Sequence, residues 1–485
     1  MLWVISTINF VIQLYNIFLM DNTYENYISP FSWRYGSLEM RQIWSEAHKR
    51  RLWRSLWVNL AEIQVEFGLV SPEQVADLKE HQNQVDIRRS LEIEAEIKHD
   101  LMAELKTFAE QCPIGGGILH MGATSMDIED NADPLRMRQS LDLLIETLRK
   151  LLIIFYEKIE RWADTPIIGF THLQPAEPST LGYRFALYAQ DLLHDWENLR
   201  RDRAHLKGKG FKGAVGTASS YTELVGIDRV QEFETRLSSL IGLPFYPITS
   251  QTYPRKQDYQ IASDLAGLGG SLYKVAFDLR ILQSPPIAEL SEPFGSKQVG
   301  SSAMPFKRNP IQAEKICSLA RMLAQMPDIT WNNAAHSLLE RTLDDSANRR
   351  SVISEMFLIS DEILNTMIKI ISGLVINEKS IKKNFEIYGA FSATERLLMA
   401  LSKSGADRQQ MHETLREHAL KAWGEVQKGE RNPILENILQ DKQIRKYLSE
   451  QEILRLMDAS HYIGDAAMRA KSFAATIKTA VEQPL

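Results

Sequence analysis

Apolar side chains recur at helical spacing through much of the chain. Between Leu141 and Trp162 they follow one face of a long helix, and from Ile261 to Leu282 they alternate in steps of four and three without interruption. Much of the stretch from Val352 to Leu374 repeats this pattern, and shorter helices are expected from about Ser37 to Leu78. Long helices with such apolar seams pack side by side at shallow angles, which predicts a long helical bundle in the middle of the chain.

Alternation of apolar and polar residues, the pattern of a half-buried strand, has no comparable run in the sequence, so we expect an all-α fold. A chain of 485 residues corresponds to about three domains of ordinary size. The predicted divisions are an upstream extension at residues 1–20, an N-terminal helical domain at 21–123, a central long-helix bundle domain at 124–376, and a C-terminal helical domain at 377–485. The length of the seams also favours an oligomer built from helix bundles.

The first twenty residues are uncharged and largely apolar, over almost the length that spans a bilayer. A secretory signal would begin with basic residues and end in a small-residue cleavage site, and a membrane anchor would be flanked by Lys or Arg rather than by Asp21 and Glu25. We therefore expect Met20 to be the natural start and the preceding segment to be poorly ordered or absent. Mass spectrometry that finds Met1 intact in the native protein would contradict this hypothesis.

Composition narrows the class of protein and of partner. Apolar residues make up 44% of the chain and charged residues 24%, as in ordinary soluble globular proteins. The net charge of −6 argues against broad nucleic-acid binding, so an anionic ligand would need a local cationic pocket. Cys112 and Cys317 form no CxxC pair or Cys/His ligand cluster, which favours a reducing compartment and argues against a structural zinc site.

The densest chemistry lies in GSSAMPFKRNPIQAE, residues 300–314. A glycine and two serines favour a mobile loop, two prolines interrupt any helix, and Lys307 and Asn309 add cationic and amide donors. A helix is expected from Ile311 to Met322, with Pro310 at its first turn. Hydroxyls and backbone N–H groups just before a helix N-terminus suit an oxyanion, although a polar loop with a capping serine is the alternative.

Two further loops offer polar groups. In GGGILHMGATSMDIEDNAD, residues 115–133, glycines permit close backbone approach, and Thr124 and Ser125 offer donors for a carboxylate or phosphate. The segment is not a P-loop, because the GK[ST] ending is missing. In GFTHLQPAEPSTLGYR, residues 169–184, His172 lies among turn-forming residues ahead of a helix that begins near Thr180. A histidine that merely caps or fills a turn is the alternative there.

A cationic set lies in ERTLDDSANRR, residues 340–350. Arginines spaced around a serine, as Arg341 and Arg350 are around Ser346, suit a phosphomonoester. Two aspartates in the same string leave open the alternative that internal salt bridges use the arginines. Shorter sets are less specific, each being by itself more typical of a surface cluster. These are Arg34 and Tyr35 in ISPFSWRYGS, Lys98, His99 and Asp100 in KHD near a helix start, and Gln251 in ITSQTYPRK.

Taken together, these residues suit elimination of a group β to a carboxylate. One residue removes a carbon-bound proton, another protonates the departing atom, and anion sites stabilise the negative charge that develops. Such a reaction requires no metal, nucleotide cofactor or covalent intermediate.

The strings also resemble a known family. SSAMPFKRN matches the SSxMPxKxN signature of the fumarase/aspartase superfamily, and HMGATSMD and THLQPA resemble its first and second conserved regions. With KHD and ERTLDDSANRR, the chain most closely resembles the adenylosuccinate lyase branch of that superfamily. The resemblance runs from about Ser29 and becomes looser after Ile376. It implies a three-domain fumarase/aspartase-like fold with a long central helical bundle.

The resemblance also implies roles for single residues. Fumarate would be eliminated from adenylosuccinate and from the succinylated aminoimidazole carboxamide ribotide, with Ser301 as general base and His172 as general acid. Lys315 stands where arginine is expected, so the charge is kept without the bidentate fork. Substrate carboxylates would be bound by Thr124, Ser125, Gln251, Lys307 and Asn309, phosphate and ribose by Arg34, Tyr35, Arg341, Ser346 and Arg350, and the base side lined by Lys98, His99 and Asp100.

The same resemblance implies a cytoplasmic homotetramer whose active sites combine segments from three subunits and act on small nucleotides. Neither nucleic acid nor membrane is expected as a partner. Two alternatives remain. Another lyase of the superfamily, such as argininosuccinate lyase, should lack the phosphate-binding sets, and a non-catalytic structural relative would not need both Ser301 and His172.

Overall fold

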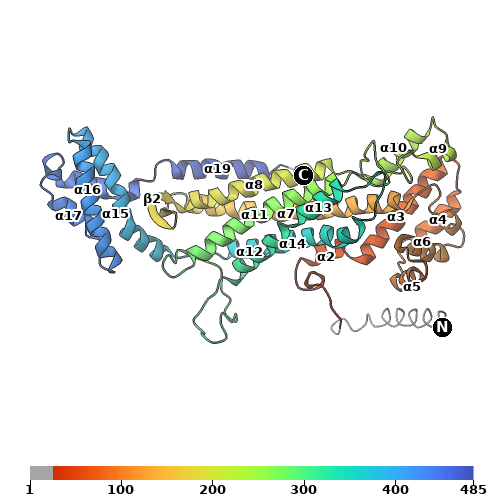
Figure 1. The fold of residues 1–485 in the computed structure, drawn as a ribbon, viewed down its shortest axis with the longest axis horizontal. Helices are drawn as coiled ribbons and strands as arrows, with labels where there is room; N and C mark the ends of the chain where they lie inside the picture. The colour runs from red at the N-terminus through yellow and green to blue at the C-terminus, as the bar shows by residue number, and fades with distance from the viewer. Residues whose placement is uncertain (1–25, 484–485) are drawn as a thin grey trace. The chain divides into compact units, whose positions relative to one another are not determined.

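Helices make up most of the chain in the computed structural model, which describes residues 26–483 (Figure 1). The all-α prediction is thereby confirmed, whereas the expected extension at residues 1–20 lies outside the described residues. The chain divides into two units, each discontinuous in sequence. The first unit comprises the described residues up to Thr147, Asp195–Gly270 and Leu319–Leu364, and the second comprises Leu148–His194, Ser271–Ser318 and the described residues from Asn365 onward.

The helices before the long central ones are α2 (Leu38–Ile43), α3 (Glu46–Glu66), α4 (Pro72–His81), α5 (Ile87–Ile97) and α6 (Asp100–Gln111). The central helices are α7 (Ser125–Trp162), α8 (Leu181–His205), α9 (Ser219–Val225), α10 (Val230–Ile241), α11 (Lys256–Leu282), α12 (Ile311–Leu323), α13 (Met326–Ala335) and α14 (Ser346–Ser372). The last helices are α15 (Glu378–Lys403), α16 (Arg408–Gln427), α17 (Ile434–Gln440), α18 (Glu450–Met457) and α19 (Ala466–Val481). The 3₁₀ turns are η2 (Pro30–Ser32), η3 (Gly116–Ile118), η4 (Ile444–Lys446) and η5 (Ala459–His461).

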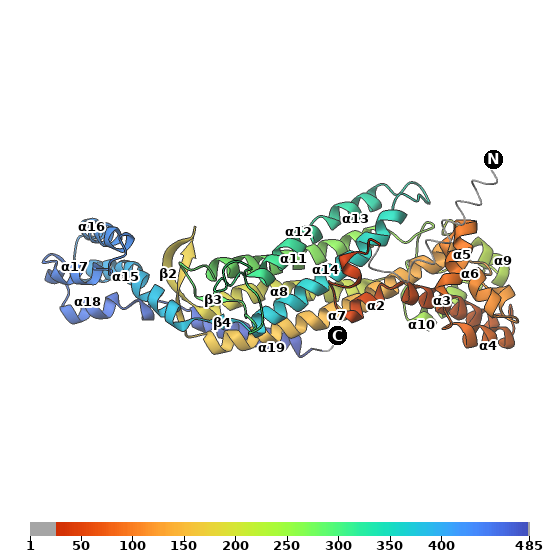
Figure 2. The same ribbon diagram turned by 90° about the horizontal axis from the view of Figure 1, so that it is seen from below.

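The predicted seams become the buried faces of the long helices. Every apolar position predicted on one face from Leu141 to Trp162 is buried in α7, and so is the series from Ile261 to Leu282 in α11. Within each unit, segments of α7, α8, α11 and α14 run side by side in both views (Figure 1, Figure 2). The indole of Trp196 on α8 donates to the Ile145 carbonyl of α7 at 3.2 Å. The predicted helical bundle is therefore present.

Short polar residues begin many helices because their side chains accept the unpaired backbone N–H groups of the first turn. Ser45 does so for α3, where it accepts from His48 N at 3.2 Å. At α4, Ser71 and Gln74 exchange hydrogen bonds in a capping box. The sequence thus specifies where these helices start.

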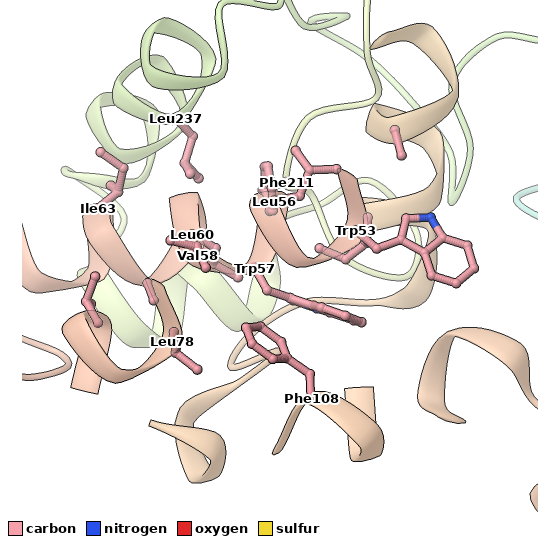
Figure 3. Packing of buried hydrophobic residues seen from close by; sticks show 14 of the residues in the cluster. Trp53, Leu56, Trp57, Val58, Leu60, Ile63, Leu78, Phe108, Phe211 and Leu237 are labelled. Atoms are coloured by element: carbon pink, nitrogen blue, oxygen red, sulfur yellow. The ribbon is translucent and has the colours of Figure 1, made fainter. Parts of the chain in front are cut away.

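The first unit has an aromatic-rich core around α3 (Figure 3). Trp53, Leu56, Trp57 and Leu60 are each at most 3% exposed, and the ring centroid of Trp57 lies 6.4 Å from that of Phe108 on α6. Burial of one such side chain stabilises the fold by roughly 1.5–3 kcal/mol. In the second unit, a separate cluster joins α15 to α18 around buried side chains such as Leu397, Leu415 and Ile453.

Two short antiparallel strand pairs are the elements that the sequence analysis did not predict. β1 (Pro166–Thr171) pairs with β2 (Gln174–Thr180), and β3 (Leu290–Ser291) pairs with β4 (Val375–Ile376). Two prolines interrupt β2 and the register shifts within β1, so neither strand has a regular alternation of apolar and polar residues. The β1–β2 hairpin carries His172.

Candidate active site

A cavity in the first unit brings together two polar sets that are distant in sequence. Asp100 comes from KHD, whereas Arg341, Ser346 and Arg350 come from ERTLDDSANRR. The guanidinium of Arg350 donates to the Asp100 carboxylate at 2.8 Å, across 250 positions of sequence. Four predicted substrate-binding residues therefore line one space, which we call the arginine cavity.

Two helix starts build this cavity. Asp100 is the first residue of α6 and Ser346 is the first residue of α14. Arg350 follows Ser346 by four residues, so the two side chains share a face of α14. The hydroxyl and the guanidinium can thus reach the same oxyanion.

Internal salt bridges engage several arginines of this string, as the alternative had anticipated. Arg341 Nη1 lies 2.9 Å from Asp345 Oδ1, and Arg349 Nε lies 2.9 Å from Asp258 Oδ2. Asp345 also accepts from buried Arg255 at 2.6 Å. The Arg350 side chain, in contrast, is 57% exposed, so that it offers donors to a ligand as well as to Asp100.

Ion pairing keeps Asp100 and Asp345 of the arginine cavity charged. Burial acts to raise the pKa of Asp100, but the charge and hydrogen bond of Arg350 outweigh burial and lower that pKa below its usual value. Burial likewise acts to raise the pKa of Asp345, and the adjacent Arg255 and Arg349 lower it overall. Both aspartates are therefore ionised at neutral pH and hold the arginines in place.

The KHD set lies beside the start of α7. His99 is the N-cap of α6, and its Nε2 lies 3.3 Å from the hydroxyl of Ser125, the first residue of α7. Lys98 has a left-handed backbone, with a φ of 57°, and its ammonium donates to Ala95 O at the end of α5. Thr124 donates its backbone N–H to the Asp127 carboxylate at 3.0 Å. His99 and Ser125 are therefore neighbours in the structure.

The segment predicted as a loop at residues 115–133 is a loop only up to Thr124, since α7 begins at Ser125. Gly115 approaches the protein's own backbone: a Cβ there would collide with the carbonyl of Gln74, and its backbone N–H donates to buried Asp77 at 2.7 Å. Gly115 therefore serves packing rather than ligand approach, whereas a Cβ on Gly117 would meet nothing within 4 Å.

Arg34 and Tyr35 follow the short turn η2. The next residue, Gly36, donates its backbone N–H to Glu362 of α14 at 3.0 Å, and its φ of 79° brings it against Leu358. The pair is thereby attached to the helix that carries Ser346 and Arg350. Arg34 is exposed, with its guanidinium 5.6 Å from the ring centroid of Trp33.

Gln251 lies next to the cationic string through its backbone. Its N–H donates to the carbonyl of Glu340 at 3.1 Å, immediately before Arg341. The Gln251 side chain is partly buried. A residue predicted from a weak string thus lies beside a residue of the arginine cavity.

His172 occupies the tip of the β1–β2 hairpin in the second unit. Thr171 faces Gln174, so that only His172 and Leu173 form the turn, with φ values of 53° and 59°. Left-handed backbone at both positions is the geometry of a tight I′ turn, which normally favours Asn or Gly. The imidazole is exposed at this tip, where it can reach a substrate.

Residues 292–310 connect β3 to α12, and Figure 1 shows them leaving the helices as a long loop. The Ser301 hydroxyl oxygen accepts from the backbone N–H groups of Ala303 and Met304 at 3.3 and 3.1 Å. Asn309 Nδ2 donates to Gly300 O at 3.1 Å and holds the two ends of the turn together. Phe306 is 82% exposed, so the loop presents apolar as well as polar groups to solvent.

The expected helix after this loop is confirmed as α12, but its N-terminus is already occupied. The carboxylate of Glu292 accepts from the backbone N–H groups of Gln312 and Ala313 at about 3 Å. Burial raises the pKa of Glu292, and these backbone donors oppose the increase. The oxyanion that we expected at this N-terminus is therefore part of the protein, supplied from twenty positions upstream in the sequence.

Among the described residues, no hydrogen bond joins Ser301 to His172, although both belong to the second unit. Lys307 is exposed in the loop, and Lys315 lies partly buried in the second turn of α12. The second unit thus holds the predicted acid, base and signature cations, and the first unit holds the arginine cavity.

Sequence reasoning missed other groups near these residues. Trp57 donates its indole N–H to Nδ1 of His120 at 3.0 Å, which leaves Nε2 to carry the imidazole proton, and burial lowers the pKa of His120. Lys49 and Glu129 line the arginine cavity. The residue types gave no signal, because single charged residues on amphipathic helices are ordinarily solvated.

A metal site and a membrane-spanning helix are two features that the described residues could contain. Within residues 26–483, no group of three or more side chains is placed to hold a metal ion. In the same range, none of the helices combines the length and apolar character needed to cross a membrane.

Comparison with known families and proteins gives two family matches. The family described as Lyase matches residues 70–324, and the family described as Adenylosuccinate lyase C-terminus matches residues 390–473. The second match begins within α15, in the region where the sequence alone offered little.

Single relatives align over nearly the whole chain. The adenylosuccinate lyase of Saccharomyces cerevisiae is 36% identical over 93% of this chain and 94% of its own length. That of Schistosoma mansoni is 37% identical over the same shares. The Pyrococcus abyssi adenylosuccinate lyase is 37% identical over 90% of this chain and 95% of its own.

Solved structures share the fold at lower identity. The 3-carboxy-cis,cis-muconate lactonizing enzyme of Pseudomonas putida is 23% identical and superposes with a TM-score of 0.81 over 92% of this chain and 99% of its own. A fumarate lyase from Mesorhizobium is 22% identical, with a TM-score of 0.80 over 93% of this chain and 99% of its own.

Proposed function

Since the chain belongs to the adenylosuccinate lyases, we propose that it eliminates fumarate from adenylosuccinate to give AMP, and from the succinylated aminoimidazole carboxamide ribotide to give AICAR. One observation carries the nucleotide assignment. Arg341, Ser346 and Arg350 line the same cavity as Asp100, and this donor set suits a phosphomonoester. A lyase whose substrate lacks phosphate has no need of it.

The proposed reaction begins at the succinyl group. Ser301 removes a proton from the carbon next to one carboxylate, and the electrons of that C–H bond form the double bond of fumarate. The C–N bond breaks, its electron pair passes to the departing nitrogen, and that nitrogen takes a proton from His172. A well-placed acid or base contributes about 10²- to 10⁴-fold in rate.

A serine hydroxyl is a poor base unless its ionised form is stabilised. Two backbone N–H groups already point at the Ser301 oxygen, and donors to an oxyanion favour the deprotonated state. Lys307 in the same loop adds positive charge. These groups support Ser301 as the base.

We propose that each active site is completed by neighbouring copies in a homotetramer. Exposure around the two reacting residues supports this: exposed His172 lies at a hairpin tip, and Ser301, itself partly buried, belongs to a loop in which Val299 is 77% and Phe306 is 82% exposed. Such side chains are normally covered when a partner is present.

The test follows the absorbance of purified protein supplied with adenylosuccinate. We expect AMP and fumarate to appear in equal amounts. Fumarate formed from argininosuccinate, with none from adenylosuccinate, would overturn the assignment in favour of another lyase of the superfamily.

A further inference from the structure

Glu129 differs from the other carboxyl groups of the arginine cavity. It lies in the second turn of α7, lines the cavity and is partly buried. Among the cavity residues that the structure describes, it is the one carboxyl group without a hydrogen bond or an ion pair to a neighbouring side chain.

Each of its acidic neighbours has a cation. On α6, Asp100 pairs with Arg350 of α14 at 2.8 Å, and on α7 itself Asp133 lies 3.4 Å from Arg136. The remaining carboxylates are paired as well: Glu46 on α3 pairs with Lys49, and Arg255 pairs with Asp345 of the cavity lining and with Asp130. The cations that face Glu129 are thus engaged by other carboxylates.

We propose that Glu129 binds the substrate phosphate as a neutral carboxylic acid, donating a hydrogen bond to it, and that ionisation of Glu129 at alkaline pH opposes phosphate binding. This inference rests on the proposed function, which places the phosphate beside Arg350. A carboxyl group can hydrogen-bond directly to an anion only by retaining its proton, because an ionised carboxylate has acceptors alone.

The electrostatic surroundings favour the neutral form. Burial is the largest cause, and Asp100, Asp133 and Asp130 add to it, so that the pKa of Glu129 rises to about 8 although Arg350 acts to lower it. At neutral pH the proton is therefore bound before the ligand arrives. A phosphate dianion close by raises the pKa further, because like charges disfavour a second anion.

The sign of the pH dependence follows from this arrangement. Phosphomonoesters lose their second proton near pH 6, so their charge no longer changes where Glu129 titrates. If binding requires the protonated form, the dissociation constant of AMP, a phosphomonoester, stays level up to about pH 8 and then rises about tenfold for each pH unit.

The test measures AMP and inorganic phosphate binding by calorimetry, from about pH 6.5 to about pH 9.5. Glu129→Gln keeps the shape and an N–H donor but cannot ionise, so its dissociation constants should match the unmodified protein at low pH and lack the alkaline rise. Glu129→Asp, which still ionises, should keep a rise. Glu46→Gln is the matched control: it removes a carboxylate of the same cavity that already has a cation, and the rise should persist.

Parallel curves for Glu129→Gln and the unmodified protein would overturn the proposal, as would a folded Glu129→Gln that binds neither probe at any pH. The two probes separate this inference from the proposed function. If phosphate shows the rise and Glu129→Gln abolishes it, but AMP does not bind, Glu129 is correctly assigned and the substrate is wrong. If neither probe binds the unmodified protein, the cavity is no phosphate site and the inference fails.

Discussion

The hydroxyl of Ser301 is the group on which the proposed chemistry depends most. Replacing it in Ser301→Ala removes the base but leaves the anion-binding groups in place, so kcat should fall by about 10²- to 10⁴-fold while KM changes little. Steady-state kinetics with adenylosuccinate measure both values. Ser302→Ala deletes the neighbouring hydroxyl of the same loop, and a larger loss there than in Ser301→Ala would assign the base to Ser302 instead.

Substitution of Arg350 tests whether the arginine cavity binds the substrate phosphate. Its guanidinium is 57% exposed and shares its donors between Asp100 and the space of the cavity. A hydrogen bond to a charged group contributes about 1.5–3 kcal/mol, so Arg350→Met should raise KM about tenfold to a hundredfold, with a smaller effect on kcat. Arg431→Met, at an 88% exposed position, is the control and should leave KM unchanged. An unchanged KM in Arg350→Met would remove the phosphate from this cavity.

For single residues, the sequence identifies polar side chains that suit a site, but it does not show which of them the fold brings together. The strings around Arg341 and Asp100 were recognised as polar sets, and their juxtaposition in one cavity needed the fold. Glu129 was not recognised at all, because burial in the folded protein is the largest cause of its raised pKa, and Asp100 of α6 adds to the effect of Asp133 and Asp130 on α7. Such a cause cannot be read from local sequence.

At the level of elements, the close packing of the glycine segment before α7 leads to a prediction about stability. A Cβ at Gly115 would overlap the Gln74 carbonyl, whereas a Cβ at Gly117 meets nothing within 4 Å. Gly115→Ala should therefore destabilise the protein by about 1–3 kcal/mol, as overpacking of a filled site does, while Gly117→Ala should be nearly neutral. Denaturant unfolding measures the difference, and equal effects of the two substitutions would contradict the packing role.

The N-terminus of α12 offers a second prediction for an element. Glu292 is 3% exposed and accepts from two backbone N–H groups of the first turn. Glu292→Ala should leave these donors unpaired and cost about 1–2 kcal/mol, while Glu292→Gln keeps one acceptor oxygen and should cost less. Glu450→Ala, at an exposed first-turn position of α18, is the control and should cost a few tenths. Equal stability of Glu292→Ala and the parent would show that the contact is not a cap.

The elements also show where sequence reasoning stops. α7 and α11 were predictable because their apolar seams repeat over many turns, and α12 because a proline and polar residues precede it. The β1–β2 hairpin was not, since Pro175 and Pro178 interrupt β2 and the two-residue turn contains neither Asn nor Gly. The cap from Glu292 was equally hidden, because nothing local connects it to α12.

At the scale of the whole molecule, the main feature is that the predicted site residues are divided between the two units. The predicted acid and base belong to the second unit, while the arginine cavity is built within the first. The two solved structures share the helical fold of this chain at identities of 22–23%, so the fold tolerates wide changes in sequence. The fold class could be predicted from periodicity alone, whereas the assignment of substrate needed the match with the lyase strings.

Sharing of active sites between copies can be tested by complementation. Ser301→Ala and His172→Ala chains should each lose most of their activity, but a site that takes Ser301 from one copy and His172 from another can be intact in a mixed tetramer. Random mixing in equal amounts should restore about a quarter of the sites.

The chains carry different tags and are refolded together, so that purification through both tags isolates the mixed assemblies. Activity in that fraction well above that of either parent variant is expected. Mixed tetramers without activity would place both residues of each site on one chain, and the absence of mixed assemblies on refolding would contradict the proposed homotetramer.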